Sequence, residues 1–515
     1  MIQESTSPKR GIVERFLFGL ETLGNKIPDP MLLFIFLSLA AILLSAALSS
    51  AGFSAINPIT QKTVKVYNLL SVDGFILMLT SAVTNFTSLP ALGMVLVCMM
   101  GVGVCDRAGL FLTGLKGMIQ NSKGSDLKII TIFMVACLLS HVAGGTGFVV
   151  MPPLGAMIFA AMGRNPLAGM MAAYATVSGA FASNYVITSM DVVTVSFTLA
   201  AAKLVIPDIA LSPAITYYFS AISATTLTIA SVVLTIKVLE PRLGPYKGTY
   251  GADQEQHATT PEEKKALRYA IISALIFIAV VCLGVIPENG ILRDVKTASA
   301  LSSKAPLMRG LTMIIALFFF VPGTVFGLYS GKFKGFKDVA GAMGKSMADM
   351  GSYIALMFVI AQFLAYFDVT NIGIILAIKS ASALQASNFP IWIVLVLYVV
   401  ICSLINIIIG SASTKWALLS TVFVPMFMFL GYHPALAQMA YLIGDAVTNP
   451  ICPADAYFAM LLVLARKYDH SVGVGTLLAN MMPYAITFFV IMTAQLLIWF
   501  FLGLPFGPGA PLLLR

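Results

Sequence analysis

Long apolar stretches separated by short polar loops run through almost the whole chain. The stretches near residues 31–53, 88–105, 269–287, 309–329 and 476–502 are each close to the roughly 20 residues that a membrane-spanning helix needs. Of the 515 residues, 59% are apolar and 10% are charged, whereas soluble proteins carry about 25% charged residues. The pattern predicts an all-α polytopic membrane protein without a sizeable soluble domain.

The basic residues gather in the short loops, where they indicate orientation. Such residues mark the cytoplasmic side of a membrane protein, and two groups of them lie two crossings apart: Lys9, Arg10, Arg15 and Lys26, then Arg107, Lys116, Lys123 and Lys128. We therefore expect a cytoplasmic N-terminus. The excess of 31 Lys and Arg over 22 Asp and Glu reflects this topology and does not indicate a nucleic-acid partner.

Two apolar stretches do not fit as simple crossings. Counting by the basic loops gives about nine transmembrane helices, and it requires residues 128–163 and 390–430 to enter and leave by the same face. Their centres are HVAGGTG at 141–147 and GSASTKW at 410–416. Irregular backbone at membrane depth is tolerated only where protein or a watery cavity surrounds it. We predict two re-entrant hairpins whose tips face a site.

The two hairpins belong to an internal repeat with an offset of 268 residues. This offset aligns four pairs of residues: Thr146 with Thr414, Phe148 with Trp416, Gly163 with Gly431 and Pro166 with Pro434. After a slip of three residues, GAFASN at 179–184 aligns with GDAVTN at 444–449. The first hairpin begins inside and the second outside, so the halves are inverted. Inverted repeats with interrupted helices are typical of secondary transporters, whose sites lie near the midplane.

The repeat divides the chain into two halves around a linker. The predicted parts are a first half at 1–239 with its hairpin at 128–163 and an interrupted helix at 166–203, a cytoplasmic linker at 240–268, and a second half at 269–515 with its hairpin at 390–430 and an interrupted helix at 434–465.

Acidic and amide side chains at the two breaks suggest a coupling ion. Asn184 and Asn449, with Asp445 and carbonyl groups freed by the breaks, offer the oxygen ligands that a hard cation prefers, which predicts a sodium site. A carboxylate at the bilayer centre costs at least about 2.5 kcal/mol, so we interpret Asp445 as a coupling-ion ligand or proton carrier. The alternative is a structural bond to free backbone amides. Asp191 and Asp455 are weaker candidates for the same role.

The hairpin tips suggest the place of an anionic solute. Helix N-termini and hydroxyl groups favour anions, and Lys415 is a candidate partner for a carboxylate, with an ion pair to a nearby acid as the alternative. Trp416 is a candidate for stacking on an aromatic solute, with simple packing as the alternative. The predicted substrate-binding residues are Thr146, Asn184, Ser413, Thr414, Lys415, Trp416, Asn449 and Pro453.

The chain resembles the p-aminobenzoyl-glutamate transporter (AbgT) family over nearly its whole length. The resemblance rests on several strings in order, which include LGNKIPDPMLLF at 23–34, MPPLGAMIF at 151–159, GRNPLAG at 163–169, SGAFASN at 178–184, GSASTKW at 410–416 and GDAVTN at 444–449. It implies a homodimer in the bacterial cytoplasmic membrane, with nine spans and two hairpins in each protomer. It also implies functional roles for Asp191, Ser413, Trp416, Pro434, Asp445 and Pro453. Many members carry an acid where this chain has Gly145.

These observations predict a secondary active transporter of p-aminobenzoyl-glutamate or a related aromatic or amino-acid-conjugated carboxylate, coupled to Na⁺ or H⁺. The alternatives are an efflux pump for sulfonamide antimetabolites, which the resemblance also implies, and an ion channel. We do not expect an enzyme, because HExxH and GxSxG motifs are absent from the sequence. No cofactor other than the coupling ion is expected.

Overall fold

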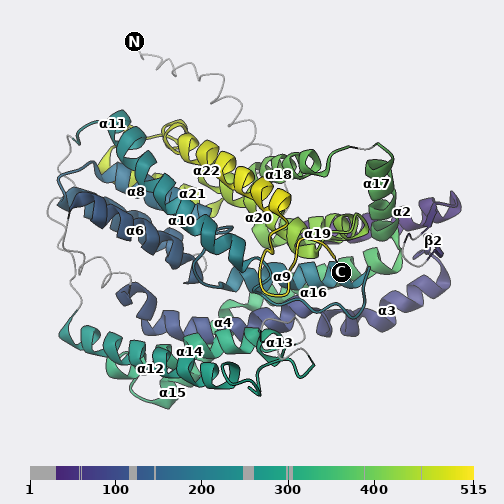
Figure 1. Cartoon of the computed structure of the whole chain (residues 1–515), viewed down its shortest axis with the longest axis horizontal. Coiled ribbons are helices and arrows are strands. Elements are labelled where there is room, and N and C mark those ends of the chain that lie inside the picture. The colour runs from purple at the N-terminus through teal and green to yellow at the C-terminus, as the bar shows by residue number, and fades with distance from the viewer. Residues whose placement is uncertain are drawn as a thin grey trace, which may run out of the picture.

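The fold is described from a computed structural model of the chain (Figure 1). The described residues are 30–56, 58, 61–114, 125–143, 146–246, 260–296, 300, 305–387, 389–453 and 455–514. Several positions used in the predictions fall outside them, namely Lys9, Arg10, Arg15, Lys26, Lys116, Lys123, Gly145 and the central part of the linker at 247–259.

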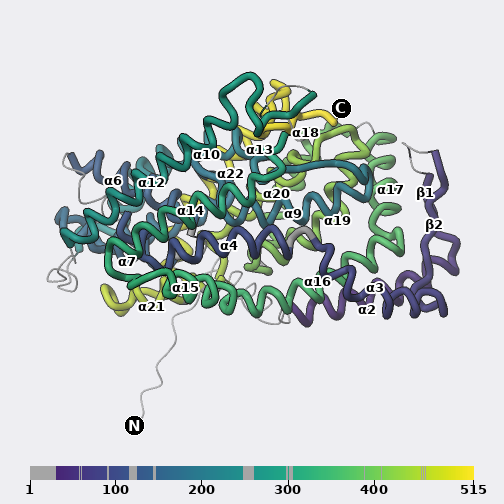
Figure 2. The backbone as a smooth tube through the Cα atoms, turned by 90° about the horizontal axis from the view of Figure 1, so that it is seen from below, coloured from purple at the N-terminus to yellow at the C-terminus, as the bar shows by residue number. Residues whose placement is uncertain are grey.

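The first part of the chain contains helices and one short β-hairpin. Its elements are α2 (Pro30–Ser50), β1 (Ser54–Ile56), β2 (Thr63–Lys65), α3 (Val72–Thr87), α4 (Pro90–Ala108), α6 (Asp126–Ser140), η1 (His141–Ala143), α7 (Thr146–Ala161), α8 (Pro166–Gly179), α9 (Ser189–Lys203), α10 (Tyr217–Leu234), the π-helical turn η2 (Thr235–Leu239) and α11 (Glu240–Leu243). The strands are antiparallel, with Ala55 opposite Val64, and lie at one end of the molecule in Figures 1 and 2.

In the second part, the elements found among the described residues are all helices, joined by turns and irregular segments. Its elements are α12 (Pro261–Val285), α13 (Pro306–Arg309), α14 (Leu311–Tyr329), α15 (Phe336–Asp349), α16 (Gly351–Val369), α17 (Ile372–Ala386), α18 (Ile391–Ile408), α19 (Ala412–Phe429), α20 (Pro434–Thr448), η3 (Asn449–Ile451), α21 (Ala456–Tyr468) and α22 (Val474–Leu502).

The helices confirm the predicted all-α polytopic class. Eight helical segments within the described residues are long and apolar enough to cross a membrane. One of them, α19, is an arm of the second predicted hairpin, and the interrupted helices α8–α9 and α20–α21 are too short in each piece to count. Leaving out the hairpin arm and counting the two interrupted helices gives the nine crossings that the loop charges predict.

Both predicted hairpin stretches fold back on themselves. After α7, the Arg164 guanidinium lies 3.1 Å from the carboxylate of Asp126, the first residue of α6, so the stretch ends beside its own beginning. In the second stretch, the rings of Tyr398 on α18 and Phe423 on α19 are 4.3 Å apart. Because these rings are almost equally distant from the turn at 409–411, the arms run antiparallel.

The same local structure follows each hairpin, as the repeat requires. The second arm ends at a glycine with positive φ, Gly163 at +70° or Gly431 at +88°, a conformation in which glycine is favoured. Two residues later, the side chains of Asn165 and His433 cap the next helix by accepting a hydrogen bond from the N–H two positions on, at 3.0 and 3.2 Å. A proline then occupies the first helical position in both halves.

The helices form two groups with α9 between them. In the first group, α4 packs against α14 and α15, and α14 packs against α12, which places these helices along one side of Figure 1. In the second group, α7 packs on α8, α18 on α20, and α10 and α20 on α22. Helix α9 contacts α4 on one side and α19 on the other. It therefore connects the first group to the second hairpin.

The predicted linker is too long at its C-terminal end. Helix α12 begins at Pro261, so residues 261–268 are helical. A capping box starts it: the Thr260 hydroxyl accepts a hydrogen bond from the N–H of Glu263 at 3.2 Å, and the Glu263 carboxylate accepts one from the N–H of Thr260 at 3.1 Å. The sequence Thr-Pro-Glu-Glu carries this signal, since a capping box with proline at the first position marks a helix start.

Glycine allows α7 and α8 to approach closely. A Cβ atom built on Gly155 would clash with the backbone oxygen of Gly169, and one built on Gly169 would clash with the oxygen of Gly155. Small residues at such positions let membrane helices pack backbone to backbone.

We expect Gly155→Val to lower the melting temperature in detergent and the monodisperse yield, because overpacking typically costs about 1–3 kcal/mol. Gly93→Val is the matched control, since Gly93 lies in α4 with no atom within 4 Å of a built Cβ. Equal melting temperatures for the two variants would contradict the close packing of α7 and α8.

Candidate functional site

The interrupted helices break close to where the sequence predicts. Helix α8 ends at Gly179 and α9 starts at Ser189, so Asn184 lies in irregular backbone between them. Asn449 follows the last residue of α20 and begins the short η3 turn. Asn184 thus lies within the first break, whereas Asn449 keeps helical backbone angles and the irregular backbone follows η3, at Cys452, Pro453 and Asp455.

A buried ion pair joins the second hairpin to the second interrupted helix. Lys415, near the start of α19, places its ammonium nitrogen 2.5 Å from the Asp445 carboxylate on α20. The side chains are 1% and 0% exposed. The ion-pair interpretation of Lys415 is therefore the one found in this structure. Removing one member of such a pair leaves an uncompensated buried charge.

Asn406 organises the groups around this ion pair. Its amide oxygen accepts a hydrogen bond from Lys415. Its amide nitrogen lies 2.8 Å from the backbone oxygen of Asp445, 3.0 Å from the Thr448 hydroxyl and 2.7 Å from the amide oxygen of Asn449. Asn406 is not among the residues predicted from the sequence, although a polar residue inside the apolar run of α18 is a signal for a functional or structural role.

The Asp445 carboxylate receives further hydrogen bonds. The Tyr441 hydroxyl lies 3.4 Å from one carboxylate oxygen, and the amide nitrogen of Asn449 lies 3.2 Å from the other. The structure thus brings together two of the three predicted sodium ligands, Asp445 and Asn449. The third, Asn184, donates within its own segment to the oxygen of Ala180 at 3.4 Å. The Lys415 ammonium supplies the positive charge next to Asp445.

Asp191 and Asp455 both cap the second piece of an interrupted helix. Asp191 accepts hydrogen bonds from the backbone N–H and the hydroxyl of Thr188, at 2.7 and 2.8 Å. Asp455 accepts one from the backbone N–H of Tyr457 at 3.0 Å. A negative charge at a helix N-terminus is stabilising. For Asp191, the spacing Thr-x-x-Asp in the sequence is already a capping signal.

Trp416 connects the second hairpin to α9. Its indole N–H lies 3.0 Å from both the backbone oxygen of Thr194 and the hydroxyl of Thr198. Its ring stacks on Tyr441 with centroids 4.5 Å apart, and its side chain is fully buried. The structure therefore agrees with packing as the role of Trp416. Gln438 on α20 joins the same group through a 2.6 Å hydrogen bond from Thr198.

A cavity of about 270 Å³ lies where the hairpin tips and the breaks meet. The first hairpin contributes His141 and Phe148, and the second contributes Ser413. Phe181 lines it from the first break, and Tyr457 from the first turn of α21. Phe148 and Tyr457 stack with centroids 4.9 Å apart and planes at 8°. The remaining lining residues are Val95, Met99, Ser189, Met190, Val193, Met350 and Tyr353, so no charged side chain of the described residues lines the cavity.

Among the described residues that line this cavity, Ser413 is the one that the sequence predicted to bind substrate. Thr414 and Lys415 are buried behind Ser413 in the first turn of α19. Pro453 lies in the break before α21, and Pro434 is the first residue of α20. Thr146 begins α7, but its side chain is outside the part of the structure that is described.

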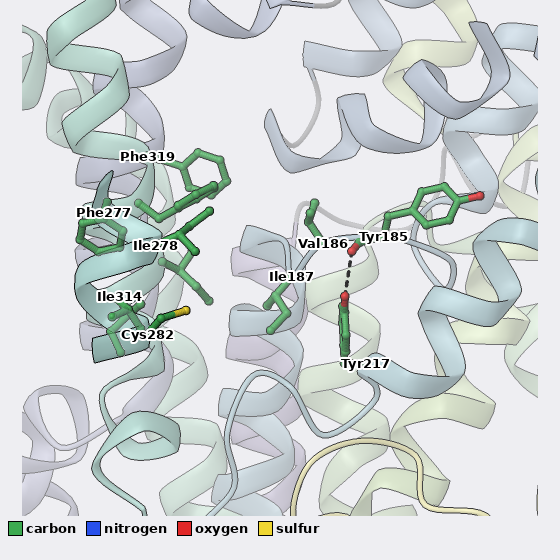
Figure 3. A pocket seen from close by; sticks show the side chains of 12 residues that line it. Tyr185, Val186, Ile187, Tyr217, Phe277, Ile278, Cys282, Ile314 and Phe319 are labelled. Carbon is green, nitrogen blue, oxygen red and sulfur yellow. Dashed lines mark hydrogen bonds between the residues drawn. The ribbon is translucent and has the colours of Figure 1, made fainter. Parts of the chain in front are cut away.

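A second pocket, of about 300 Å³, lies on the other side of the first break (Figure 3). Val186 and Ile187 face Phe277 and Cys282 of α12 across it, and its lining is almost entirely apolar. The Tyr217 hydroxyl donates a 3.1 Å hydrogen bond to the backbone oxygen of Tyr185. Residues 185–187 therefore line this pocket, while their neighbours Phe181 and Ser189 line the central cavity.

Paired hairpins, matched interrupted helices and a central cavity at their meeting point define a secondary transporter. A model of the AbgT transporter family matches residues 15–514. This chain belongs to the AbgT family.

Relatives of known name and structure match over nearly their full length. The chain is 35% identical to the p-aminobenzoyl-glutamate transport protein of Escherichia coli (strain K12) over 497 residues, which are 96% of each chain. The chains of two solved structures are also 35% identical to this chain. They are the YdaH transporter of Alcanivorax borkumensis, with a TM-score of 0.88 over 93% of this chain and 100% of that one, and MtrF of Neisseria gonorrhoeae, which represents a class of antimetabolite efflux pumps, with a TM-score of 0.90 over 96% and 100%.

Proposed function

We propose that this protein moves p-aminobenzoyl-glutamate, or a related aromatic carboxylate, across the cytoplasmic membrane by secondary active transport coupled to Na⁺ or H⁺. The observation that carries the proposal is the central cavity, where residues from both repeats provide aromatic walls beside the N-terminus of α19. The 35% identity to a p-aminobenzoyl-glutamate transport protein supports this substrate class.

The cavity suits a solute with an aromatic end and an anionic end. Phe148, Phe181 and Tyr457 offer apolar ring surfaces, on which an aryl group gains about 0.5–1.5 kcal/mol beyond simple burial. Ser413 lies in the first turn of α19, where backbone N–H groups and the helix dipole favour a carboxylate. The solute would thus lie with its ring in the aromatic part and its carboxylates toward the α19 end.

The buried ion pair provides a means of coupling. A proton or Na⁺ that joins the Asp445 carboxylate competes with the Lys415 ammonium, which lies 2.5 Å away. Neutralising Asp445 frees the positive charge of Lys415, two residues from Ser413 at the cavity. That charge raises the electrostatic potential felt by an anionic solute. Cation and anion then strengthen each other's binding by the same factor, as thermodynamic linkage requires.

Uptake of labelled p-aminobenzoyl-glutamate into proteoliposomes tests this function. We expect saturable uptake that an imposed inward Na⁺ or H⁺ gradient stimulates and that stops when an ionophore collapses the gradient. Protein-free liposomes are the control. Solute flux that is unaffected by either gradient would contradict coupled transport. Non-saturable flux with ionic conductance would indicate the channel alternative.

Export of antimetabolites is the second candidate function, because the chain shares 35% identity with MtrF. Inside-out vesicles loaded by the same protocol distinguish the directions. Gradient-driven sulfonamide transport from the cytoplasmic to the external side, at a rate that added p-aminobenzoyl-glutamate does not reduce, would favour export of antimetabolites.

A homodimer with cytoplasmic N-termini is also part of the proposal. The resemblance to the family supports the dimer, and the basic loops support the orientation. Mass measurement of the detergent-solubilised protein and protease accessibility of an N-terminal tag in right-side-out vesicles test the two statements separately.

A further inference from the structure

His141, at the tip of the first hairpin, is a buried polar side chain without a partner in the described part of the chain. The residue is 2% exposed, and neither ring nitrogen makes a hydrogen bond there. Leaving a buried donor or acceptor unsatisfied costs about 1–3 kcal/mol. The other buried histidine, His433, differs, because its ring nitrogen accepts a hydrogen bond from the N–H of Ala435.

The unpaired ring borders the central cavity. His141 lines it together with Phe181, whose ring centroid is 4.3 Å from that of the imidazole. The stacked pair of Phe148 and Tyr457 forms another part of the same wall. A planar solute resting against these rings would have its edge next to His141. Both ring nitrogens are buried and lack a partner in the described part of the chain, so a ligand that bonded to one of them would satisfy it.

We propose that His141 recognises the primary amine on the aromatic ring of the solute by a hydrogen bond from the amine to an imidazole nitrogen. The inference rests on the proposed function, since it specifies how that function's substrate class is distinguished. It makes His141 a specificity-determining residue for solutes with an arylamine end, which p-aminobenzoyl-glutamate and sulfonamide antimetabolites share.

The charge of the cavity favours this orientation over the reverse one. Among the residues that the structure describes, no Lys, Arg, Asp or Glu lines it. Beside His141, a glutamyl end with two carboxylates would be desolvated away from the α19 N-terminus and Lys415, whereas a neutral arylamine needs only one acceptor. The α19 N-terminus at Ser413 remains for the anionic end.

The test combines removal of the solute amine with removal of the imidazole. Transport of p-aminobenzoyl-glutamate and of benzoyl-glutamate, which lacks the amine, is measured in proteoliposomes for the wild type and for His141→Phe. We expect the wild type to favour the amine by about tenfold or more in kcat/KM, equivalent to about 1.4 kcal/mol. In His141→Phe the two solutes should be transported almost equally, with benzoyl-glutamate little affected.

Two further variants define the result. His141→Gln retains a hydrogen-bonding side chain and should keep part of the preference for the amine. This variant also tests the inference if His141→Phe does not fold. His433→Asn is the matched control, because asparagine can also cap α20 and the preference should be unchanged. An undiminished preference in both His141 variants would overturn the inference. A wild type that transports neither solute would instead contradict the proposed function.

Discussion

Asp445→Asn is expected to reduce gradient-driven transport at least about tenfold, which corresponds to about 1.4 kcal/mol of activation or coupling free energy. The substitution keeps the shape of the side chain but removes the charge that balances Lys415, 2.5 Å away and equally buried. It therefore also affects folding. A neutral amide taken by itself is cheaper to bury than a carboxylate. In this structure, however, the substitution leaves the Lys415 ammonium unpaired, at a cost of about 3–5 kcal/mol.

A paired substitution separates the loss of stability from the loss of coupling. We expect Lys415→Met combined with Asp445→Asn to recover most of the melting temperature, because a neutral replacement of a buried ion pair is often tolerated. Gradient-driven transport should stay low, because the double variant has neither a carboxylate to bind the coupling ion nor a lysine whose charge that binding would release. Melting is followed by tryptophan fluorescence in detergent, and flux in proteoliposomes.

Asp349→Asn is the control for these charge substitutions. Asp349 pairs with Arg107, but its side chain is 67% exposed, and exposed pairs contribute about 0–1 kcal/mol. Asp349→Asn should therefore leave the melting temperature and transport close to those of wild type.

If Asp445→Asn had the melting temperature and the ion dependence of wild type, the proposed role of the Lys415–Asp445 pair would be refuted. The coupling site would then be sought at Asp191 or Asp455.

Trp416→Ala is expected to destabilise the protein by about 3–5 kcal/mol, the usual cost of removing a large buried aromatic side chain. The indole stacks on Tyr441 and donates to Thr194 and Thr198 of α9, so its removal leaves a cavity and disconnects the second hairpin from α9. Trp416→Phe keeps most of the ring volume. It should show a smaller loss of stability and a KM close to wild type.

The same two variants distinguish packing from substrate contact. If Trp416 stacked on the solute, Trp416→Phe would raise the KM for p-aminobenzoyl-glutamate without affecting the melting temperature. That outcome would contradict the position of Trp416 seen here, where the buried ring stacks on Tyr441 and is not among the described residues that line the cavity. Thermal melting and concentration-dependent uptake, measured on the same preparations, provide both quantities.

The locally encoded parts of the fold could be predicted from the sequence. Gly163, Gly431 and the prolines that follow them impose turns and helix starts within a few residues, so the order and spacing of these residues show the repeat. The breaks near Asn184 and Asn449 follow from the same local chemistry. The fold class can be predicted from little more than the lengths of the apolar stretches.

The site could be predicted only in part, because its contacts connect distant segments. Lys415 and Asp445 are 30 residues apart and meet only after the hairpin packs on α20. Asn406, which joins them, lies on a third helix. Asp191 illustrates a different gap: its capping role was encoded locally, in Thr188 three residues earlier, but an acid inside a transporter also suggests ion binding. His141 is unpaired because the described residues packed around it offer its ring nitrogens no hydrogen-bond partner. That depends on tertiary packing, which no local sequence pattern encodes.

The ion pair between Lys415 and Asp445 also determines how the transporter responds to voltage. A buried pair of opposite charges has no net charge, so displacing both together across part of the membrane performs almost no electrical work. Each unbalanced charge, by contrast, is worth about 2.3 kcal/mol per 100 mV. Under the proposed coupling, the membrane potential would therefore act on the solute and the coupling ion, and the stoichiometry of this cargo would set the sign and the size of the current.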